Sequence, residues 1–249
     1  MDLHLKDKSA VVTGASAGIG RAIALALAGE GVRLALVARG REALEAVADE
    51  IGAAGSPRPA VIAQDVTEPG AARAVATAAR AALGRIEILA NSAGGRRPSG
   101  AAPTEEEWES ALLLNFSQQR RLTAELVPDM ITAGFGRIVN ITGKSEPTRM
   151  SPEFSAKAAM HAWSKGLSRD LGPHGITVNC LAPGRFLTAQ MQRNYTPQQR
   201  EEHARDIPVG RYGQPAEMAA VACFLCSPVA AYITGTVIPV DGGLRRYQF

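Results

Sequence analysis

Short runs of apolar, often β-branched residues alternate along the chain with longer segments rich in alanine and leucine. The apolar runs show almost no alternation with polar positions, which is typical of strands that are buried on both faces. The strands predicted in this way are Ser9–Thr13, Arg33–Ala38, Ala60–Gln64, Ile86–Ala90, Arg137–Thr142, Ile176–Leu181 and Thr236–Val240. The helices predicted between them are Ile19–Ala28, Arg41–Ile51, Ala71–Leu83, Glu105–Ala133 and Glu153–Leu171.

This order of elements predicts an α/β fold. Buried strands that are separated by helices form parallel sheets covered on both faces, so we expect a single doubly wound, Rossmann-type domain over residues 1–249 with a seven-stranded parallel sheet. One long segment, at about residues 185–215, breaks the alternation and has a predicted helix only at Gln198–Arg205. A segment of that length in a compact domain is typical of a lid over a binding site.

The composition of the chain narrows the partners, the location and the cysteine chemistry that we expect. The chain has 249 residues and a formal net charge of +3 with scattered basic residues, which gives no reason to expect nucleic acid as a partner. The uncharged stretch from Met218 to Val240 is interrupted by prolines and a glycine, so it predicts a buried helix, a turn and a strand, not a membrane span. Three cysteines are too few for a disulfide framework, and the pair in Cys223-Phe224-Leu225-Cys226 is expected in the core. We expect a cytoplasmic protein without a membrane partner.

A glycine-rich turn, Thr13-Gly14-Ala15-Ser16-Ala17-Gly18-Ile19-Gly20, joins the first strand to the first helix. In that position the first glycine permits a tight exit from the strand, the second lets a pyrophosphate approach the backbone, and the third lets the helix pack closely on the sheet. The helix N-terminus then offers N–H groups to the phosphates.

Together with further motifs, this turn resembles the short-chain dehydrogenase/reductase family, and within it the 3-oxoacyl-acyl-carrier-protein reductase-like branch. The other motifs are Asn91-Ser92-Ala93-Gly94, Asn115, Lys157, Asn179-Cys180-Leu181-Ala182-Pro183-Gly184 and Val240-Asp241-Gly242-Gly243. They follow the family's order over nearly the whole chain.

The resemblance implies a nicotinamide cofactor site. The residues carried over to it are Gly14, Ser16, Gly18 and Ile19 for the phosphates; Asp65 and Val66 for the adenine; Asn91, Ala93 and Gly94 beside the adenosine ribose; Lys157 for the nicotinamide ribose; and Pro183, Gly184, Phe186 and Thr188 around the nicotinamide amide and pyrophosphate. Members that prefer NAD carry an acidic residue at the end of the second strand, where this chain has Arg39. An arginine pairs with the 2′-phosphate that a carboxylate would repel, so NADP(H) is favoured over NAD(H).

The catalytic set departs from the family pattern. The resemblance implies a serine, a tyrosine, a lysine and an asparagine, of which Asn115 and Lys157 are present. Glu153 stands four residues before Lys157, where the tyrosine belongs, and Gly143 stands in the place of the serine. A carboxyl group with an ordinary pKa of about 4.3 is ionised at neutral pH, and apolar burial would raise its pKa into the range of a proton donor. Thr142, Ser145 or the lid residue Tyr195 could replace a missing hydroxyl.

The leading interpretation is an oxidoreductase that acts on a carbonyl or alcohol, including acyl thioesters, with a non-standard proton-transfer site. Asn115 would hold a relay water, and Glu153 or a water would handle the proton. Two alternatives stay open, namely a nicotinamide-nucleotide-binding sensor or scaffold without dehydrogenase activity, and non-redox chemistry with Glu153 as base. The sequence predicts no metal site. The region around Trp108 and Asn115 matches the family's packing surface, so a homodimer or homotetramer is expected, and Arg96 and Arg97 are candidates for contact with an anionic substrate.

Overall fold

The protein is described by a computed structural model that covers residues 1–95, 100, 102–143 and 150–245. Within these ranges one parallel sheet contains seven strands in the order β3-β2-β1-β4-β5-β6-β7. The strands are β1 (Ser9–Thr13), β2 (Arg33–Ala38), β3 (Ala60–Ala63), β4 (Ile88–Asn91), β5 (Gly136–Ile141), β6 (Ile176–Pro183) and β7 (Val237–Val240). The order reverses at β1, so the carboxyl ends of β1 and β4 flank the crevice in which doubly wound folds bind ligands. The predicted fold class is confirmed.

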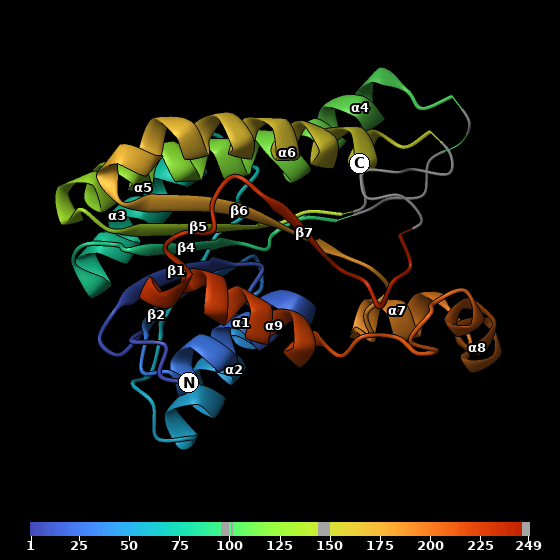
Figure 1. The fold of residues 1–249 in the computed structure, drawn as a ribbon, viewed down its shortest axis with the longest axis horizontal. Coiled ribbons are helices and arrows are strands. Elements are labelled where there is room, and N and C mark those ends of the chain that lie inside the picture. The colour runs from blue at the N-terminus through green and yellow to red at the C-terminus, as the bar shows by residue number, and fades with distance from the viewer. Residues whose placement is uncertain (96–99, 101, 144–149, 246–249) are drawn as a thin grey trace.

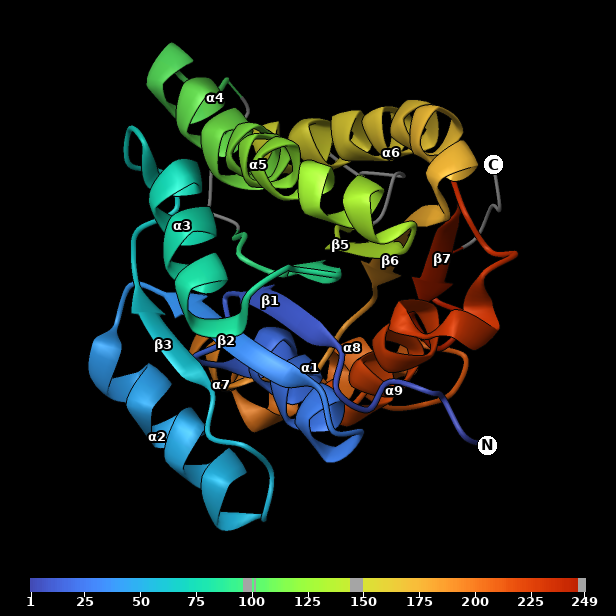
Figure 2. The ribbon, with the colours of Figure 1, turned by 90° about the vertical axis from the view of Figure 1, so that its left-hand side faces the viewer.

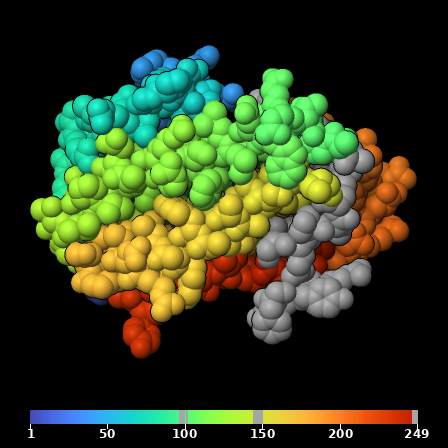
Figure 3. All heavy atoms as spheres, turned by 90° about the horizontal axis from the view of Figure 1, so that it is seen from above, coloured from blue at the N-terminus to red at the C-terminus, as the bar shows by residue number. Residues whose placement is uncertain are grey.

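Helices cover both faces of the sheet (Figure 1 and Figure 2). One face carries α1 (Gly18–Gly29), α2 (Arg41–Ala53) and α9 (Pro215–Cys226). The other carries α3 (Ala71–Leu83), α4 (Glu105–Leu112), α5 (Gln118–Ala133) and α6 (Pro152–Leu171). Figure 3 looks onto this second layer, where α3, α5 and α6 lie side by side. Since helices cover both faces, the strands are apolar on both sides, as the sequence pattern indicates.

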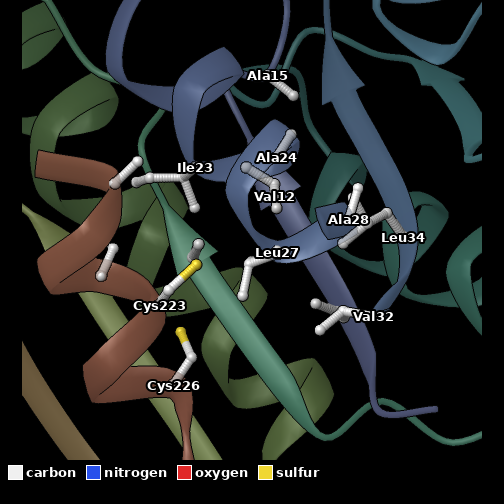
Figure 4. Close-up of a cluster of buried hydrophobic side chains, with 14 of the residues drawn as sticks. Val12, Ala15, Ile23, Ala24, Leu27, Ala28, Val32, Leu34, Cys223 and Cys226 are labelled. Carbon is white, nitrogen blue, oxygen red and sulfur yellow. The ribbon is translucent and has the colours of Figure 1, made fainter. Parts of the chain in front are cut away.

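Close packing of α1 against α9 buries the two cysteines of the predicted core pair (Figure 4). Cys223 and Cys226 lie among Ile23 and Leu27 of α1, and burial raises the pKa of the Cys223 thiol to about 12. A thiol that stays protonated is neither a metal ligand nor a nucleophile at neutral pH. No group of three or more His, Cys, Asp or Glu side chains that could hold a metal occurs among the described residues.

Apart from shifts of one or two residues at the ends of several elements, two features differ from the sequence predictions. The predicted continuous helix Glu105–Ala133 is interrupted by a π-helical turn at Leu113–Ser117 between α4 and α5. The lid contains two helices where the sequence predicts one, because α7 (Ala189–Asn194) precedes α8 (Pro197–Arg205). The hydroxyl of Thr188 accepts a hydrogen bond from the Met191 N–H at 3.2 Å and caps α7, a local interaction that the hydrophobic pattern does not reveal.

The stretch from Met218 to Val240 contains α9, a short 3₁₀ turn and β7, as predicted. Within the part of the chain that the structure describes, none of the helices has both the length and the apolar character needed to cross a bilayer.

The close approach of α1 to β1 gives a prediction for stability. A β-carbon on Gly20 would lie 2.3 Å from the carbonyl oxygen of Gly14, whereas one on Gly29, at the other end of α1, would meet nothing within 4 Å. We expect Gly20→Ala to lower the free energy of unfolding by about 1–3 kcal/mol or more, since backbone cannot move aside as a flexible side chain can. Gly29→Ala should be neutral or stabilising by up to about 1 kcal/mol. Urea unfolding of both variants measures the difference, and equal midpoints would contradict the prediction.

Candidate functional site

A cavity of about 1470 Å³ opens at the carboxyl ends of the central strands. Its described walls come from the glycine-rich turn after β1, the segment after β4, the ends of β5 and β6, the start of α6, the lid with α7 and α8, and the segment after β7. Sites for single ligands commonly measure about 300–1000 Å³. The cavity therefore has room for a dinucleotide and a second molecule.

The glycine-rich turn presents open backbone at one end of this cavity. Gly14 and Gly18 have φ angles of +66° and +56°, which favour glycine, and a β-carbon on Gly14 would lie 2.9 Å from the Ser92 carbonyl oxygen. Ala17 is the N-cap of α1 and provides no side-chain hydrogen bond to the helix. The first N–H groups of α1 thus have no side-chain cap, an arrangement that fits a pyrophosphate.

The neighbouring wall after β4 is fixed by side chains beneath it. The Thr13 hydroxyl accepts hydrogen bonds from the N–H groups of Ser92 and Ala93, both at 3.0 Å. The Gln118 and Gln119 side-chain amides both donate to the Ala93 carbonyl oxygen at 3.1 Å. These contacts hold the backbone around Ala93 in position before any ligand binds.

The structure brings together ten of the residues that the resemblance implies. Those that line the cavity are Gly14, Gly18, Ile19, Ala93, Gly94, Lys157, Pro183, Gly184, Phe186 and Thr188. The remaining candidates, which are not among its lining residues, are Ser16, Arg39, Asp65, Val66, Asn91, Asn115 and Glu153. Ser145, Arg96 and Arg97 lie outside the described residues.

Two of the remaining candidates, both asparagines, are buried and bonded within the protein. The Asn91 side-chain amide donates to Asn140 Oδ1 at 2.9 Å and links β4 to β5. Asn115 lies in the π-helical turn, where its amide donates to the Ala111 carbonyl oxygen and its Oδ1 accepts from the Gly95 N–H, both at 3.1 Å. The side chains of both asparagines therefore support the cavity wall from behind.

Arg39 and Asp65 lie near each other, after β2 and β3. Arg39 is exposed. The pKa of the Asp65 carboxyl is lowered by hydrogen bonds from Thr67 and, to a smaller extent, by the positive charge of Arg39. The exposed guanidinium is in a position to meet a phosphate at this edge of the sheet.

Lys157 lies against Gly143, the residue at which the sequence resemblance implies a serine in the family. A β-carbon on Gly143 would lie 3.0 Å from Lys157 Cδ and 3.6 Å from its Nζ. Both residues line the cavity. The missing side chain at position 143 therefore leaves the space that the lysine occupies, and the ammonium group lies close to where a serine side chain would start.

Phe154, not Glu153, faces the cavity. Phe154 is among the lining residues, whereas Glu153 is 6% exposed and its carboxylate accepts a hydrogen bond from the Ser151 hydroxyl at 2.7 Å. Glu153 also lies in the first turn of α6, where the partial positive charge of the helix N-terminus stabilises an anion. These two contacts favour the ionised form of the carboxyl group, whereas its burial favours the neutral form.

A histidine on α6 supports another wall residue. His161 Nε2 lies 2.8 Å from the hydroxyl of Thr142, and that hydroxyl donates to the Leu181 carbonyl oxygen at 3.1 Å. Because the Thr142 proton is used in this way, His161 Nε2 is the donor to Thr142. Burial, and then the positive charges of Arg245 and Lys157, lower the pKa of His161 to about 4. The imidazole is therefore neutral at physiological pH.

The lid contributes the candidate Tyr195 to the cavity, together with His203, Tyr212 and Arg185, which the sequence motifs do not indicate. Tyr195 packs edge-on against His203, with ring centroids 4.9 Å apart, and His203 Nδ1 lies 3.0 Å from the Tyr212 hydroxyl. All three line the cavity, as does Arg185, directly after Pro183 and Gly184. The position of Arg185 at the carboxyl end of a central strand is the one signal by which the sequence could have singled it out.

The sheet order, the glycine-rich turn and the cavity define a dinucleotide-binding fold of the Rossmann type. Comparison with known proteins identifies the family. Residues 14–245 match the family described as Enoyl-(Acyl carrier protein) reductase, and the chain belongs to the short-chain dehydrogenase/reductase family.

Three similar proteins illustrate the range of relatives. The 3-oxoacyl-[acyl-carrier-protein] reductase FabG of Escherichia coli is 35% identical over 246 residues, which cover 97% of this chain and 99% of the relative. The structure of YwfH, an NADPH dependent reductase involved in bacilysin biosynthesis, has a TM-score of 0.92 at 31% identity and covers 97% of this chain and 99% of its own. A 7α-hydroxysteroid dehydrogenase complexed with NADH and 7-oxo glycochenodeoxycholic acid has a TM-score of 0.93 at 33% identity, with 97% and 96% covered.

The lowered pKa of His161 gives a prediction for the pH dependence of stability. The folded state keeps the imidazole neutral down to about pH 4, whereas the unfolded chain binds a proton near its ordinary pKa of 6.5. The unfolded state thus holds more protons between these values, so stability should fall as the pH drops from 6.5 to 4 and this contribution should level off below. His161→Gln removes the titrating group, and urea unfolding at several pH values should show a smaller decline for this variant. Identical declines in the two proteins would show that His161 does not have this pKa.

Proposed function

We propose that the protein is an NADP(H)-dependent oxidoreductase that interconverts a carbonyl and an alcohol, with Lys157 as the group that exchanges the proton. The observation that carries this proposal is the position of Lys157, which lines the cavity and lies against Gly143. The family membership of the chain supports the class of reaction.

The cavity fits the cofactor. In this proposal the uncapped start of α1, with Gly14, Gly18 and Ile19, holds the pyrophosphate, while Ser16 stands half-buried beside it. The fixed backbone at Ala93 and Gly94 supports the adenosine ribose, and the residues that enclose the nicotinamide are Pro183, Gly184, Phe186 and Thr188. Asp65 and Val66 are assigned to the adenine, and Asn91 and Asn115 position the wall through their buried hydrogen bonds. When bound, the nicotinamide supplies or accepts the hydride.

Arg39 supports a preference for NADP(H). The relatives include an NADPH dependent reductase and a dehydrogenase complexed with NADH, so family membership leaves the preference open. The exposed guanidinium after β2 stands where an acidic residue would select against a 2′-phosphate.

In the proposal, Lys157 is the general acid that gives a proton to the carbonyl oxygen of the substrate. An alkyl ammonium has an ordinary pKa of about 10.4, near the value of about 10 for a phenol, so the two are acids of similar strength. As negative charge develops on the carbonyl oxygen, the Lys157 ammonium donates a hydrogen bond to that oxygen and then transfers its proton. The neutral amine takes a proton from water in the open cavity. In the oxidation direction the neutral amine accepts the alcohol proton.

Glu153 is a weaker candidate for this step. The Ser151 hydroxyl donates to the Glu153 carboxyl group and holds it at the start of α6. Its side chain is also not among those that line the cavity. In the proposal Glu153 shapes the start of α6, one turn before Lys157.

Substrates of the relatives suggest the first compounds to test, namely a 3-oxoacyl thioester and a 7-oxo steroid. A homodimer or homotetramer that packs through the region around Trp108 and Asn115 stays a prediction.

Cofactor preference is tested by replacing Arg39. We expect Arg39→Gln to weaken NADPH binding by about 10–100-fold, the equivalent of one charge-assisted contact, and to leave NADH binding unchanged. Arg33→Gln is the matched control, because Arg33 lies at the opposite end of β2 and donates to the Leu83 carbonyl oxygen. Calorimetric titration of both cofactors measures the effect. Equal losses for NADPH and NADH, or none, would contradict the role of Arg39.

The role of Lys157 is tested with a pair of variants on α6. Lys157→Met should lower kcat for reduction of the carbonyl compounds above by about 10²–10⁴-fold, the usual contribution of general acid catalysis. Glu153→Gln should change kcat by less than about tenfold. NADPH oxidation, followed at saturating cofactor, gives both values. If Glu153→Gln lost most of its kcat while Lys157→Met stayed active, Glu153 and not Lys157 would be the group that exchanges the proton.

Tight NADPH binding without turnover of any carbonyl compound would support the alternative of a nucleotide-binding protein without dehydrogenase activity.

A further inference from the structure

Arg185 is a charged residue on the cavity wall that the cofactor scheme leaves unassigned. Its side chain is 30% exposed, and its Nη2 lies 3.8 Å from Asp206 Oδ2, too far for a hydrogen bond. Its Nη1 is buried and has no hydrogen-bond partner. A buried cationic donor without an acceptor is costly, and the exposed Asp206 meets the guanidinium only through this long ion pair, so Nη1 is available to donate to a further anionic group.

The backbone around Arg185 is anchored to the far side of the lid. The Gly213 N–H donates to the Arg185 carbonyl oxygen at 2.9 Å, and the Leu187 N–H donates to the Gly213 carbonyl oxygen at 2.8 Å. Between them, the Phe186 ring packs against Gly213 and is 5% exposed. The Arg185 carbonyl oxygen and the Phe186 ring are thus both held against Gly213, which fixes the backbone from which the Arg185 side chain extends.

The position of Arg185 separates it from the phosphate-binding turn. Arg185 follows β6, and β4 and β5 lie between β6 and β1 in the sheet, so the two strand ends are about 14 Å apart at ordinary strand spacing. The lid residue that contacts the glycine-rich turn is Thr188, which would lie 3.4 Å from a β-carbon on Gly18. Thr188 thus lies at the glycine-rich turn, whereas Arg185 follows β6, which pairs with β5, the strand that precedes Gly143.

Positive charge dominates the described wall of the cavity. The arginine and lysine residues that line it are Lys157, Arg185, Arg193 and Arg245, and the acidic ones are Asp206 and Asp241. The Asp241 carboxylate already accepts hydrogen bonds from the backbone N–H groups of Gly243 and Arg245, at 2.9 and 3.0 Å. A cavity with an excess of one charge concentrates molecules of the opposite charge.

We propose that Arg185 binds a carboxylate or phosphate group of the substrate, so that the protein acts on anionic carbonyl compounds. This assignment rests on the proposed function and names the substrate class for the same cavity. Asp206, the carboxylate nearest to the guanidinium, competes with that anion for Arg185. Removal of the Asp206 charge should therefore strengthen anion binding, whereas removal of the Arg185 charge should weaken it.

The test uses the full chain saturated with NADP⁺, which cannot reduce a carbonyl compound, and three probes in calorimetric titrations: acetoacetate, its methyl ester, and inorganic phosphate. The acid and the ester differ by one charge at nearly the same shape. We expect acetoacetate to bind at least about tenfold more tightly than the ester, as one charge-assisted contact allows. Arg185→Gln should remove this difference, and Asp206→Asn should increase it. The phosphate titration decides which of the two anions Arg185 prefers.

Arg205→Gln is the matched control, because Arg205 lies on α8 next to Asp206, pairs with Glu201 and does not line the cavity. It should bind all probes as the unchanged protein does. NADPH affinity in Arg185→Gln, expected within about twofold of the unchanged protein, reports that this variant is folded.

Three results would overturn the assignment. Equal binding of acid and ester by the unchanged protein would show that the cavity does not select an anion. Unchanged acetoacetate and phosphate binding in Arg185→Gln would show that another residue holds the anion. Weaker NADPH binding in Arg185→Gln would place the residue in the cofactor site. A protein that binds no NADPH would instead contradict the proposed function, and the same titrations without cofactor would still test Arg185.

Discussion

The close contact between the first turn of α1 and the end of β1 is the constraint on which the site depends. Gly20 has no side chain, and the Gly14 carbonyl oxygen occupies the place where its β-carbon would be. The N-terminus of α1 is therefore held directly above the end of the strand, with its N–H groups toward the cavity. The Thr13 hydroxyl fixes the backbone of the adjoining wall after β4. A phosphate-binding surface at the reversal of strand order follows from these short-range contacts, and the lid closes over it from the β6 side.

Much of this architecture could be predicted from the sequence, because parallel strands buried on both faces leave an unbroken apolar run that few other elements produce. Strands β1 and β2 and helix α3 have the predicted boundaries. The features that the sequence did not reveal depend on local hydrogen bonds. The π-helical turn around Asn115 accommodates a side chain that bridges Ala111 and Gly95, and helix α7 begins at the Thr188 cap. Neither interaction changes the hydrophobic pattern, so periodicity alone could not have found it.

Those parts of the candidate site that are formed by backbone could be predicted from the sequence. The parts that depend on the direction of a side chain could be predicted less well. Glycine positions fix the course of the chain, and the structure places Gly14, Gly18 and Gly184 at the cavity. Spacing four residues before Lys157 selects Glu153, yet the helix begins with Ser151 as N-cap, and this start buries Glu153 and turns Phe154 toward the cavity. The rotation of a helix about its own axis is set by its cap and its tertiary contacts, which one sequence without relatives does not show.

Gly143, Phe154 and Lys157 lie together at the cavity wall. Gly143 provides the space in which Lys157 lies, and a serine there would bring its β-carbon to 3.0 Å from Lys157 Cδ, closer than ordinary contact. Phe154 presents an apolar face beside them, which lowers the local polarity and strengthens the interaction of an ammonium with a developing oxyanion. The absence of a side chain at position 143 and the position of Lys157 are thus linked. In the proposed function, the cation of Lys157 stabilises the negative charge that develops on the carbonyl oxygen, in place of neutral hydroxyl donors. In the same way, the cation of Arg185 binds the negative charge of the substrate's carboxylate or phosphate group.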